Sequence, residues 1–146
     1  MNIRKVVHSD IIALAQLMLS VYNAPPWNEE WTEKTARQSL ESLLTFPHFY
    51  GNVMEKDGKI VAAMLGHIRI YATEKSYYMD EFFVSPTCQG QGFGSHLYQT
   101  TLKELKQEGV AGSFFTSLKN SPAYHFYKKQ GAKDLADSVC FYHHLY

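Results

Sequence analysis

The chain has 146 residues and a mass of 16.7 kDa. This length predicts one domain over residues 1–146, because two cores of half this length would each bury too little surface. Fourteen Lys and Arg residues balance fourteen Asp and Glu residues, and 45% of the chain is hydrophobic. This composition argues against a disordered chain and against a polycation that binds nucleic acid.

The sequence predicts neither a membrane segment nor a metal site. The first ten residues lack the pattern of a secretory signal. The longest apolar stretch, residues 11–22, is interrupted by Gln16 and Ser20 and is too short to cross a bilayer. Cys88 and Cys140 show no disulfide or zinc-ligand spacing, so we expect free thiols and no metal. We therefore expect a cytoplasmic protein without a membrane partner.

The first half of the chain predicts a strand, two helices and a hairpin. Residues 2–7 alternate as a strand does, and Ser9 can cap a helix with an apolar face at helical spacing. A loop with two prolines follows over residues 22–31, and Thr32 can cap a second helix that ends before Pro47. Residues 49–54 and 60–70 then predict two strands joined by a tight turn at Asp57-Gly58.

The second half predicts strands and helices in alternation. A strand over 77–84 leads into a glycine-rich turn and a helix over 95–108. A short strand over 114–118, a helix over 122–130 that Gly131 ends, and a last strand over 138–145 follow. Hairpins pair antiparallel, whereas the strand–helix–strand crossover pairs parallel. The predicted fold class is therefore α/β, with a mixed antiparallel and parallel sheet flanked by helices.

The glycine-rich turn, residues 89–94, is the first candidate binding site. It lies between a strand and a helix, where backbone N–H groups and the helix dipole favour an anion. A dinucleotide fingerprint would need glycine at position 95 or 97, which are Ser95 and Leu97, and the chain has no P-loop motif. Taken alone, the turn is also consistent with a tight connection that binds nothing.

Two motifs in the second half of the chain carry a family resemblance. Gln89-x-x-Gly92-x-Gly94 follows the third predicted strand of the meander, and Asn120-x-x-Ala123-x-x-x-Tyr127-x-x-x-Gly131 follows the next strand. Both resemble motifs of the GNAT superfamily of acyl-CoA-dependent N-acetyltransferases, the first being its pyrophosphate loop. The resemblance implies a GNAT-like fold and direct transfer of an acetyl group from acetyl-CoA to an amine. The chain departs from many relatives at Ala132, where they carry an aromatic residue.

The resemblance also implies which residues would bind acetyl-CoA. On the third strand, backbone groups of Phe82, Phe83 and Val84 would pair with the pantetheine arm and stabilise the oxyanion. Asn120 would hydrogen-bond a pantetheine amide, although Asn120 or Ser121 could equally cap the helix that starts at Pro122. The pyrophosphate loop and helix start would be formed by Gln89, Gly90, Gln91, Gly92, Phe93, Gly94 and Ser95.

Three residues are candidates for the chemistry. An ammonium must lose a proton before it attacks, and Asp80 and Glu81 directly precede the glycine turn. Strand alternation predicts that they point to opposite faces, so at most one enters the site directly. We favour Asp80 as the base, with Glu81 binding water or facing solvent, and either could be an ordinary surface carboxylate. Tyr127 is expected to protonate the departing thiolate, the alternative being a core tyrosine.

The loop between the first two helices is the candidate acceptor site. Trp27, Glu29 and Glu30 combine carboxylates with an aromatic face, which attracts cations, so we expect a small-molecule amine with more than one ammonium group. The alternative is that the tryptophans, including Trp31, anchor the second helix and the glutamates only solvate its start.

Two other classes of function remain open at this point. A catalytically silent acyl-CoA-binding sensor would need the glycines but neither Tyr127 nor a carboxylate. A protein-interaction domain could use residues 25–31 as a docking surface. The oligomeric state is left open between a monomer and a homodimer.

Overall fold

The sheet lies in the first of two units. A computed structural model describes residues 1–146. Contacts between residues divide the chain into two compact units, Met1–Phe115 and Thr116–Tyr146. The prediction of one domain over the whole chain stays a prediction. The first unit contains the strands β1 (Asn2–Lys5), β2 (Phe49–Lys56), β3 (Lys59–Ile70), β4 (Lys75–Val84) and β5 (Val110–Phe114), the helices α1 (Ile11–Tyr22), α2 (Glu33–Leu44) and α3 (Phe93–Gln107), and the 3₁₀ turns η1 (His8–Asp10) and η2 (Pro86–Cys88).

The five strands form one mixed sheet in the order β1-β2-β3-β4-β5. The first three pairs are antiparallel and β4 pairs with β5 in parallel, which confirms the predicted fold class. The β2–β3 turn has positive φ at both Asp57 (52°) and Gly58 (76°), as the tight hairpin turn predicted from this pair requires.

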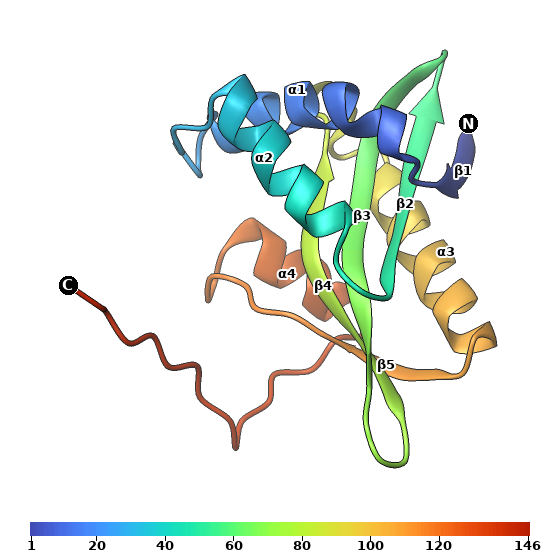
Figure 1. Ribbon diagram of the computed structural model, residues 1–146, viewed down its shortest axis with the longest axis vertical. Helices are drawn as coiled ribbons and strands as arrows, with labels where there is room; N and C mark the ends of the chain where they lie inside the picture. The colour runs from blue at the N-terminus through green and yellow to red at the C-terminus, as the bar shows by residue number, and fades with distance from the viewer. The chain divides into compact units, whose positions relative to one another are not determined.

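Helices cover both faces of the sheet, with α1 and α2 on one side and α3 on the other (Figure 1). The α1–α2 face contains the main apolar cluster, in which Leu14 and Met18 pack with Ala63, Leu65 and Phe83. The burial of this apolar cluster, rather than helix propensity, therefore stabilises α1 and α2.

Every helix of the structure is too short or too polar to span a bilayer.

A polar network joins α3 to the first two strands. The amide of Asn52, fully buried on β2, donates to Thr101 Oγ1 at 3.0 Å and to Glu104 Oε2 at 2.8 Å. Lys5 Nζ of β1 donates to the same carboxylate oxygen at 2.6 Å, and the Tyr50 hydroxyl donates to it at 3.2 Å. Because the buried groups are satisfied only in this arrangement, the network determines where α3 sits along β2.

Two predicted strands differ from the structure. The strand expected over 114–118 is β5, Val110–Phe114, because α3 ends at Gln107 and Gly109, at φ +81°, turns the chain at once. The strand expected over 138–145 does not form. Residues 133–146 are exposed and irregular after α4 (Pro122–Lys129), and the second unit contains no other strand that could pair with them.

The polar network predicts a stability effect that a surface amide does not share. Asn52→Leu keeps the approximate size of the side chain but leaves Thr101 and Glu104 without their buried donor. We expect the free energy of unfolding to fall by about 2 kcal/mol, measured by urea denaturation. The control is Gln38→Leu on the exposed side of α2, expected to change stability by less than about 0.5 kcal/mol. Equal effects of the two variants would contradict this role for Asn52.

Candidate functional site

The candidate site is built around a β-bulge in β4. Leu65 of β3 pairs with Glu81 and Gly66 pairs with Met79, so Asp80 is an extra residue without a partner across the ladder. Alternation along the strand is therefore interrupted at Asp80. The prediction that Asp80 and Glu81 point to opposite faces is wrong, because strict alternation holds only in a strand without an insertion.

Both carboxylates lie on the face covered by α1 and α2. The hydroxyl of Tyr22, the last residue of α1, donates to Glu81 Oε2 at 2.8 Å. Asp80 Oδ2 lies 2.8 Å from Nδ1 of His67, on β3. His67 shares this face with Leu65, two residues before it on the same strand. The bulge thus brings two carboxylates, a phenol and an imidazole to one side of the sheet.

Gly66 provides the room that the bulge needs. A Cβ at this position would lie 2.1 Å from the Tyr78 carbonyl oxygen and 2.6 Å from the ring of Tyr77. Neither group can move cheaply, since one is backbone and the other is a fully buried ring. Only glycine fits opposite the distorted part of β4. The sequence alone does not single out Gly66, although an isolated glycine within a strand is a signal for a bulge or a close backbone approach.

Glu81 is a partly buried carboxylate held by an aromatic group. The Tyr22 ring meets Trp27 edge-on at a centroid distance of 6.0 Å and Phe83 at 5.8 Å. Burial raises the pKa of Glu81, the Tyr22 hydrogen bond lowers it, and the negative charges of Glu29 and Asp80 raise it further, with a net upward shift. The group therefore keeps a proton to higher pH than an exposed glutamate does.

The glycine turn after β4 leads into α3 as predicted. Gly92, at φ +83°, is the N-cap, and the first intrahelical bond runs from the His96 N–H to its carbonyl at 3.0 Å. At Gly90 and Gly92 an added Cβ would meet nothing within 4 Å, so this side of the turn is open. The side chain of Gln89 donates to the Val84 carbonyl at 3.1 Å and shapes the turn from within.

The remaining residues of the turn fall into two groups. The side chain of Gln91 donates to the Thr87 carbonyl at 3.1 Å, which braces the turn rather than extending from it. Phe93, Gly94 and Ser95 form the first turn of α3, and the Lys56 ammonium lies 5.2 Å from the centre of the Phe93 ring. A helix start with open glycines is the kind of site that can hold a phosphate group.

The strand segment predicted to contact acetyl-CoA follows the bulge. Pairing between β4 and β5 runs from Lys75 to Tyr78, whose partner is Phe114, and β4 continues to Val84 beyond this last pair. Phe83 is buried under α1 and α2, whereas Phe82 meets the ring of Tyr98 on α3 edge-on at 5.9 Å. Phe82, Phe83 and Val84 thus lie between the bulge and the glycine turn.

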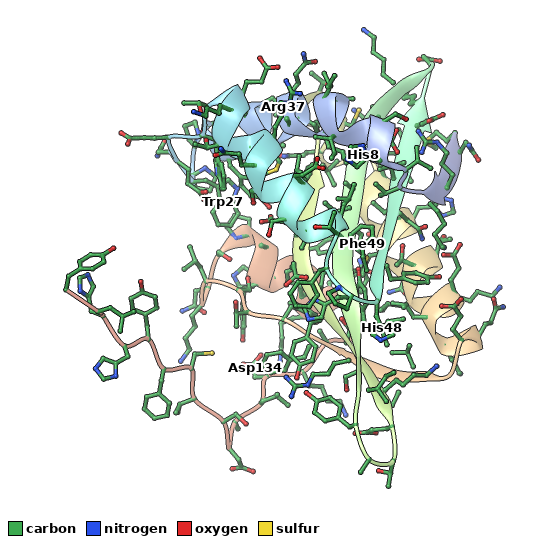
Figure 2. The ribbon with its side chains drawn as sticks, viewed as in Figure 1. His8, Trp27, Arg37, His48, Phe49 and Asp134 are labelled. Atoms are coloured by element: carbon green, nitrogen blue, oxygen red, sulfur yellow. The ribbon has the colours of Figure 1, made fainter.

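The α1–α2 loop combines anchoring contacts with exposed charge. Trp27 and Trp31 both pack against the apolar cluster, and Glu29 Oε1 accepts a hydrogen bond from Trp31 Nε1 at 2.8 Å. Figure 2 shows Trp27 on the side of the sheet where α1 and α2 lie. Glu30 is exposed. The tryptophans therefore anchor the loop, while the negative charge of Glu29 contributes to the raised pKa of Glu81.

Tyr127 and Asn120 belong to the second unit. Ser121 caps α4, because its Oγ accepts from the Tyr124 N–H at 3.1 Å, whereas Asn120 precedes the cap at φ +62°. Tyr127 is partly buried on α4, and its carbonyl accepts from the N–H of Ala132 at 3.0 Å, past Gly131, which ends the helix. The roles of Tyr127 and Asn120 stay predictions. Outside these motifs, Cys88 and Cys140 are free thiols, as expected.

Comparisons with known proteins identify the family of the chain and agree with its fold. Residues 15–132 match the model of the Acetyltransferase (GNAT) family. An aminoglycoside 6'-N-acetyltransferase from Acinetobacter haemolyticus is 16% identical over 99% of both chains, with a TM-score of 0.76. An aminoglycoside acetyltransferase from an uncultured soil metagenomic sample, in complex with sisomicin, is 22% identical over 99% of this chain and 96% of that chain, with a TM-score of 0.76.

A third solved structure is an AAC(6')-Iy enzyme in complex with the bisubstrate analog CoA-S-monomethyl-acetylneamine. It is 17% identical over 99% of this chain and 97% of that chain, with a TM-score of 0.74. No curated protein sequence matches the chain. At these identities the solved structures establish the fold and nothing more.

The buried state of Glu81 predicts a pH-dependent gain in stability when its charge is removed. Because its folded-state pKa is raised above the ordinary 4.5, stability falls as pH rises from about that value through the raised pKa. Glu81→Gln keeps an acceptor for the Tyr22 hydroxyl but cannot ionise. We expect the variant to be more stable than the wild type at pH 8 and equal to it at pH 4, measured by urea unfolding.

The matched control is Glu30→Gln, in which an exposed carboxylate is neutralised. We expect no pH-dependent difference between this variant and the wild type. A Glu81→Gln protein that is less stable than the wild type at pH 8 but not at pH 4 would show that the ionised group stabilises the fold, which contradicts a raised pKa for Glu81.

Proposed function

Because the chain belongs to the acetyltransferase (GNAT) family, we propose that it transfers the acetyl group of acetyl-CoA directly to a primary amine of a small molecule. The observation that carries the proposal is the course of β4, which joins a bulge bearing two carboxylates to an open glycine turn at the start of α3. One strand thus connects a site for proton transfer with a site for a diphosphate.

Residues of the first unit would hold the diphosphate and most of the arm of acetyl-CoA, and Asn120 would add one contact to the arm. The open turn and first helical residues, Gln89 to Ser95, offer backbone N–H groups and the positive end of the α3 dipole to the phosphates. Backbone groups of Phe82 to Val84 would bind the extended arm as an added strand, and Asn120 would bind an amide of the arm. When bound, acetyl-CoA supplies the activated acetyl group as a thioester.

The chain's own groups would then perform three tasks. Asp80 and Glu81 place negative charge beside an incoming ammonium and provide a route for its proton. A backbone N–H between Phe82 and Val84 would stabilise the developing oxyanion without a side chain. The Tyr127 phenol would give a proton to the leaving thiolate and regain one from solvent.

The charges around the bulge favour a cationic acceptor. The negative charges of Glu29 and Asp80 act on Glu81, Glu30 lies on the same α1–α2 loop, and Trp27 adds an aromatic ring. Two similar enzymes were solved with aminoglycoside ligands, sisomicin and an acetylneamine conjugate. We therefore include polyamines and amino sugars among the acceptors, with binding that weakens as salt screens the exposed glutamates.

One experiment tests the proposed function as a whole. Acetyl-CoA should raise the free energy of unfolding by about 2.7 kcal/mol at a hundredfold excess over its dissociation constant, whereas free acetate should not. A panel of mono-, di- and polyammonium amines is then assayed by thiol release. Stabilisation without turnover of any amine would identify a silent acyl-CoA-binding protein, and no stabilisation would refute the proposal.

Gly92→Ala separates phosphate binding from backbone strain. The methyl group would occupy the open side of the turn, and the φ of +83° costs a non-glycine residue about 1–2 kcal/mol. We expect stabilisation by acetyl-CoA to be lost. Gly58→Ala is the matched control, because Gly58 has a φ of +76° and open space but lies in the β2–β3 turn. It should lose similar stability and keep the response to acetyl-CoA; a normal response in Gly92→Ala would remove the turn from the site.

Tyr127→Phe tests the proton donor. Only the hydroxyl is removed, so we expect kcat to fall by about 10²-fold while acetyl-CoA still stabilises the protein. Tyr124→Phe on the same helix is the control, since it loses only a 3.0 Å hydrogen bond to Asp134. Wild-type turnover in Tyr127→Phe would assign protonation of the thiolate to water.

A further inference from the structure

We propose that His67, oriented by Asp80, is the group that accepts the proton of the amine; the inference deepens the proposed function and rests on it. Neither sequence motif includes His67, and the sequence points to Asp80, Glu81 or an ordered water for this task. The structure places the imidazole of His67, on β3, beside the carboxylate of the bulge and opposite Tyr78, the last β4 residue that pairs with β5.

The contact with Asp80 determines which nitrogen of the imidazole is available. Asp80 Oδ2 lies 2.8 Å from Nδ1, and an ionised carboxylate can only accept a hydrogen bond. Nδ1 must therefore carry the hydrogen of the neutral ring, which leaves the lone pair on Nε2. No hydrogen bond within the chain engages Nε2, so it is the free acceptor of the pair.

Aromatic contacts hold the ring in one orientation. The His67 imidazole stacks on the Tyr78 ring with a centroid distance of 5.5 Å and an interplanar angle of 13°, and Phe46 lies 4.4 Å away. The side chain is 18% exposed, against 34% for Asp80. His67 pairs across the sheet with Phe49, which Figure 2 labels near the start of β2. The ring is thus fixed yet open to solvent, as a proton acceptor requires.

The position of His67 along the sheet matches the place where the amine would react. Its partner on β4 is Tyr78, the last β4 residue that pairs with β5. Beyond it come the bulge and the Phe82–Val84 segment that would bind the acetyl-bearing arm. A thioester whose arm follows this segment from the glycine turn would end at the bulge, beside Asp80 and His67.

An imidazole is also better matched to the task than the carboxylates. Histidine is the side chain that ordinarily exchanges its proton near neutral pH, whereas an exposed aspartate stays ionised there. Glu81 is engaged by the Tyr22 hydroxyl and partly buried, which suits a counter-charge for the ammonium. His67 and Asp80 form the pair, and other titratable and charged groups face or flank it. These are Glu81 and Tyr78 on β4, Arg69 near the end of β3, Tyr71 directly after β3, His48 before β2, and Glu29 on the α1–α2 loop.

The protons balance with one acceptor. The ammonium gives its first proton to Nε2 of His67, which releases it to solvent. As the amine nitrogen bonds to the acetyl carbon and the carbon–sulfur bond breaks, nitrogen loses a second proton to solvent. Tyr127 protonates the leaving thiolate and regains a proton from solvent. The net products are an amide, a thiol and one proton, and no oxidant or reductant is involved.

The kinetic test compares two histidines that each contact a carboxylate. His67→Gln is expected to lower kcat/KM for the amine by about 10²-fold and to abolish its rise through the neutral pH range. The control is His8→Gln at the start of the first helical segment (Figure 2), because His8 contacts Glu41 at 2.7 Å in an exposed pair. It should leave the profile unchanged. A normal rise in His67→Gln would overturn the proposal.

A second test needs no turnover. Nitrogen-15 shifts of the imidazole at pH 8, assigned by their loss in His67→Gln, should show the Nδ1–H tautomer in the wild type and the Nε2–H tautomer in Asp80→Asn. Asp80→Asn should also lose part of the activity while its stabilisation by acetyl-CoA persists. An Nε2–H tautomer in the wild type would overturn the pair even in an active enzyme, whereas a wild type that shows the pair but acetylates no amine would overturn the proposed function.

Discussion

One extra residue in β4 determines how the side chains of the candidate site in the first unit are arranged. In a strand without the bulge, side chains would alternate and the neighbouring carboxylates of Asp80 and Glu81 would point to opposite faces. The bulge places Asp80 and Glu81 on the same face, and it depends on residue 66 being glycine, since any Cβ there would meet the Tyr78 carbonyl and the Tyr77 ring. The site is therefore set by a backbone irregularity, and its side chains take their positions from it.

The bulge also brings a cost in stability that the rest of the unit offsets. Glu81 sits partly buried, where its negative charge is disfavoured and only Tyr22 donates to it. The buried amide of Asn52, in contrast, donates to both Thr101 and Glu104 under α3. A fold that satisfies a structural amide but leaves a carboxylate poorly solvated is typical of a site shaped for reaction rather than for stability.

The sequence predicts the order of the elements well, because hairpin turns, caps and the glycine turn are local signals. It places β5 four residues too late, since Ala111 and Gly112 are weak strand formers and pairing with β4 decides their conformation. The bulge is a property of the ladder between two strands, so alternation along one strand cannot reveal it. His67 was missed for the same reason: its partner Asp80 is thirteen residues away and meets it only through the register.

Because β4 carries both parts of the site, their separation is a property of one strand. At about 3.3 Å per residue, the four steps from Asp80 to Val84 span about 13 Å before the chain enters the glycine turn. A ligand with a diphosphate at that turn can reach the bulge only through an extended arm that follows the strand. An inserted or deleted residue between Asp80 and Phe82 would shift the site for the diphosphate by one residue along the strand. It would also turn the side chains of Phe82 and Phe83 to the opposite faces of the sheet. The length and the register of residues 80–84 therefore constrain each other. They also limit which ligand could extend from the glycine turn to the His67–Asp80 pair.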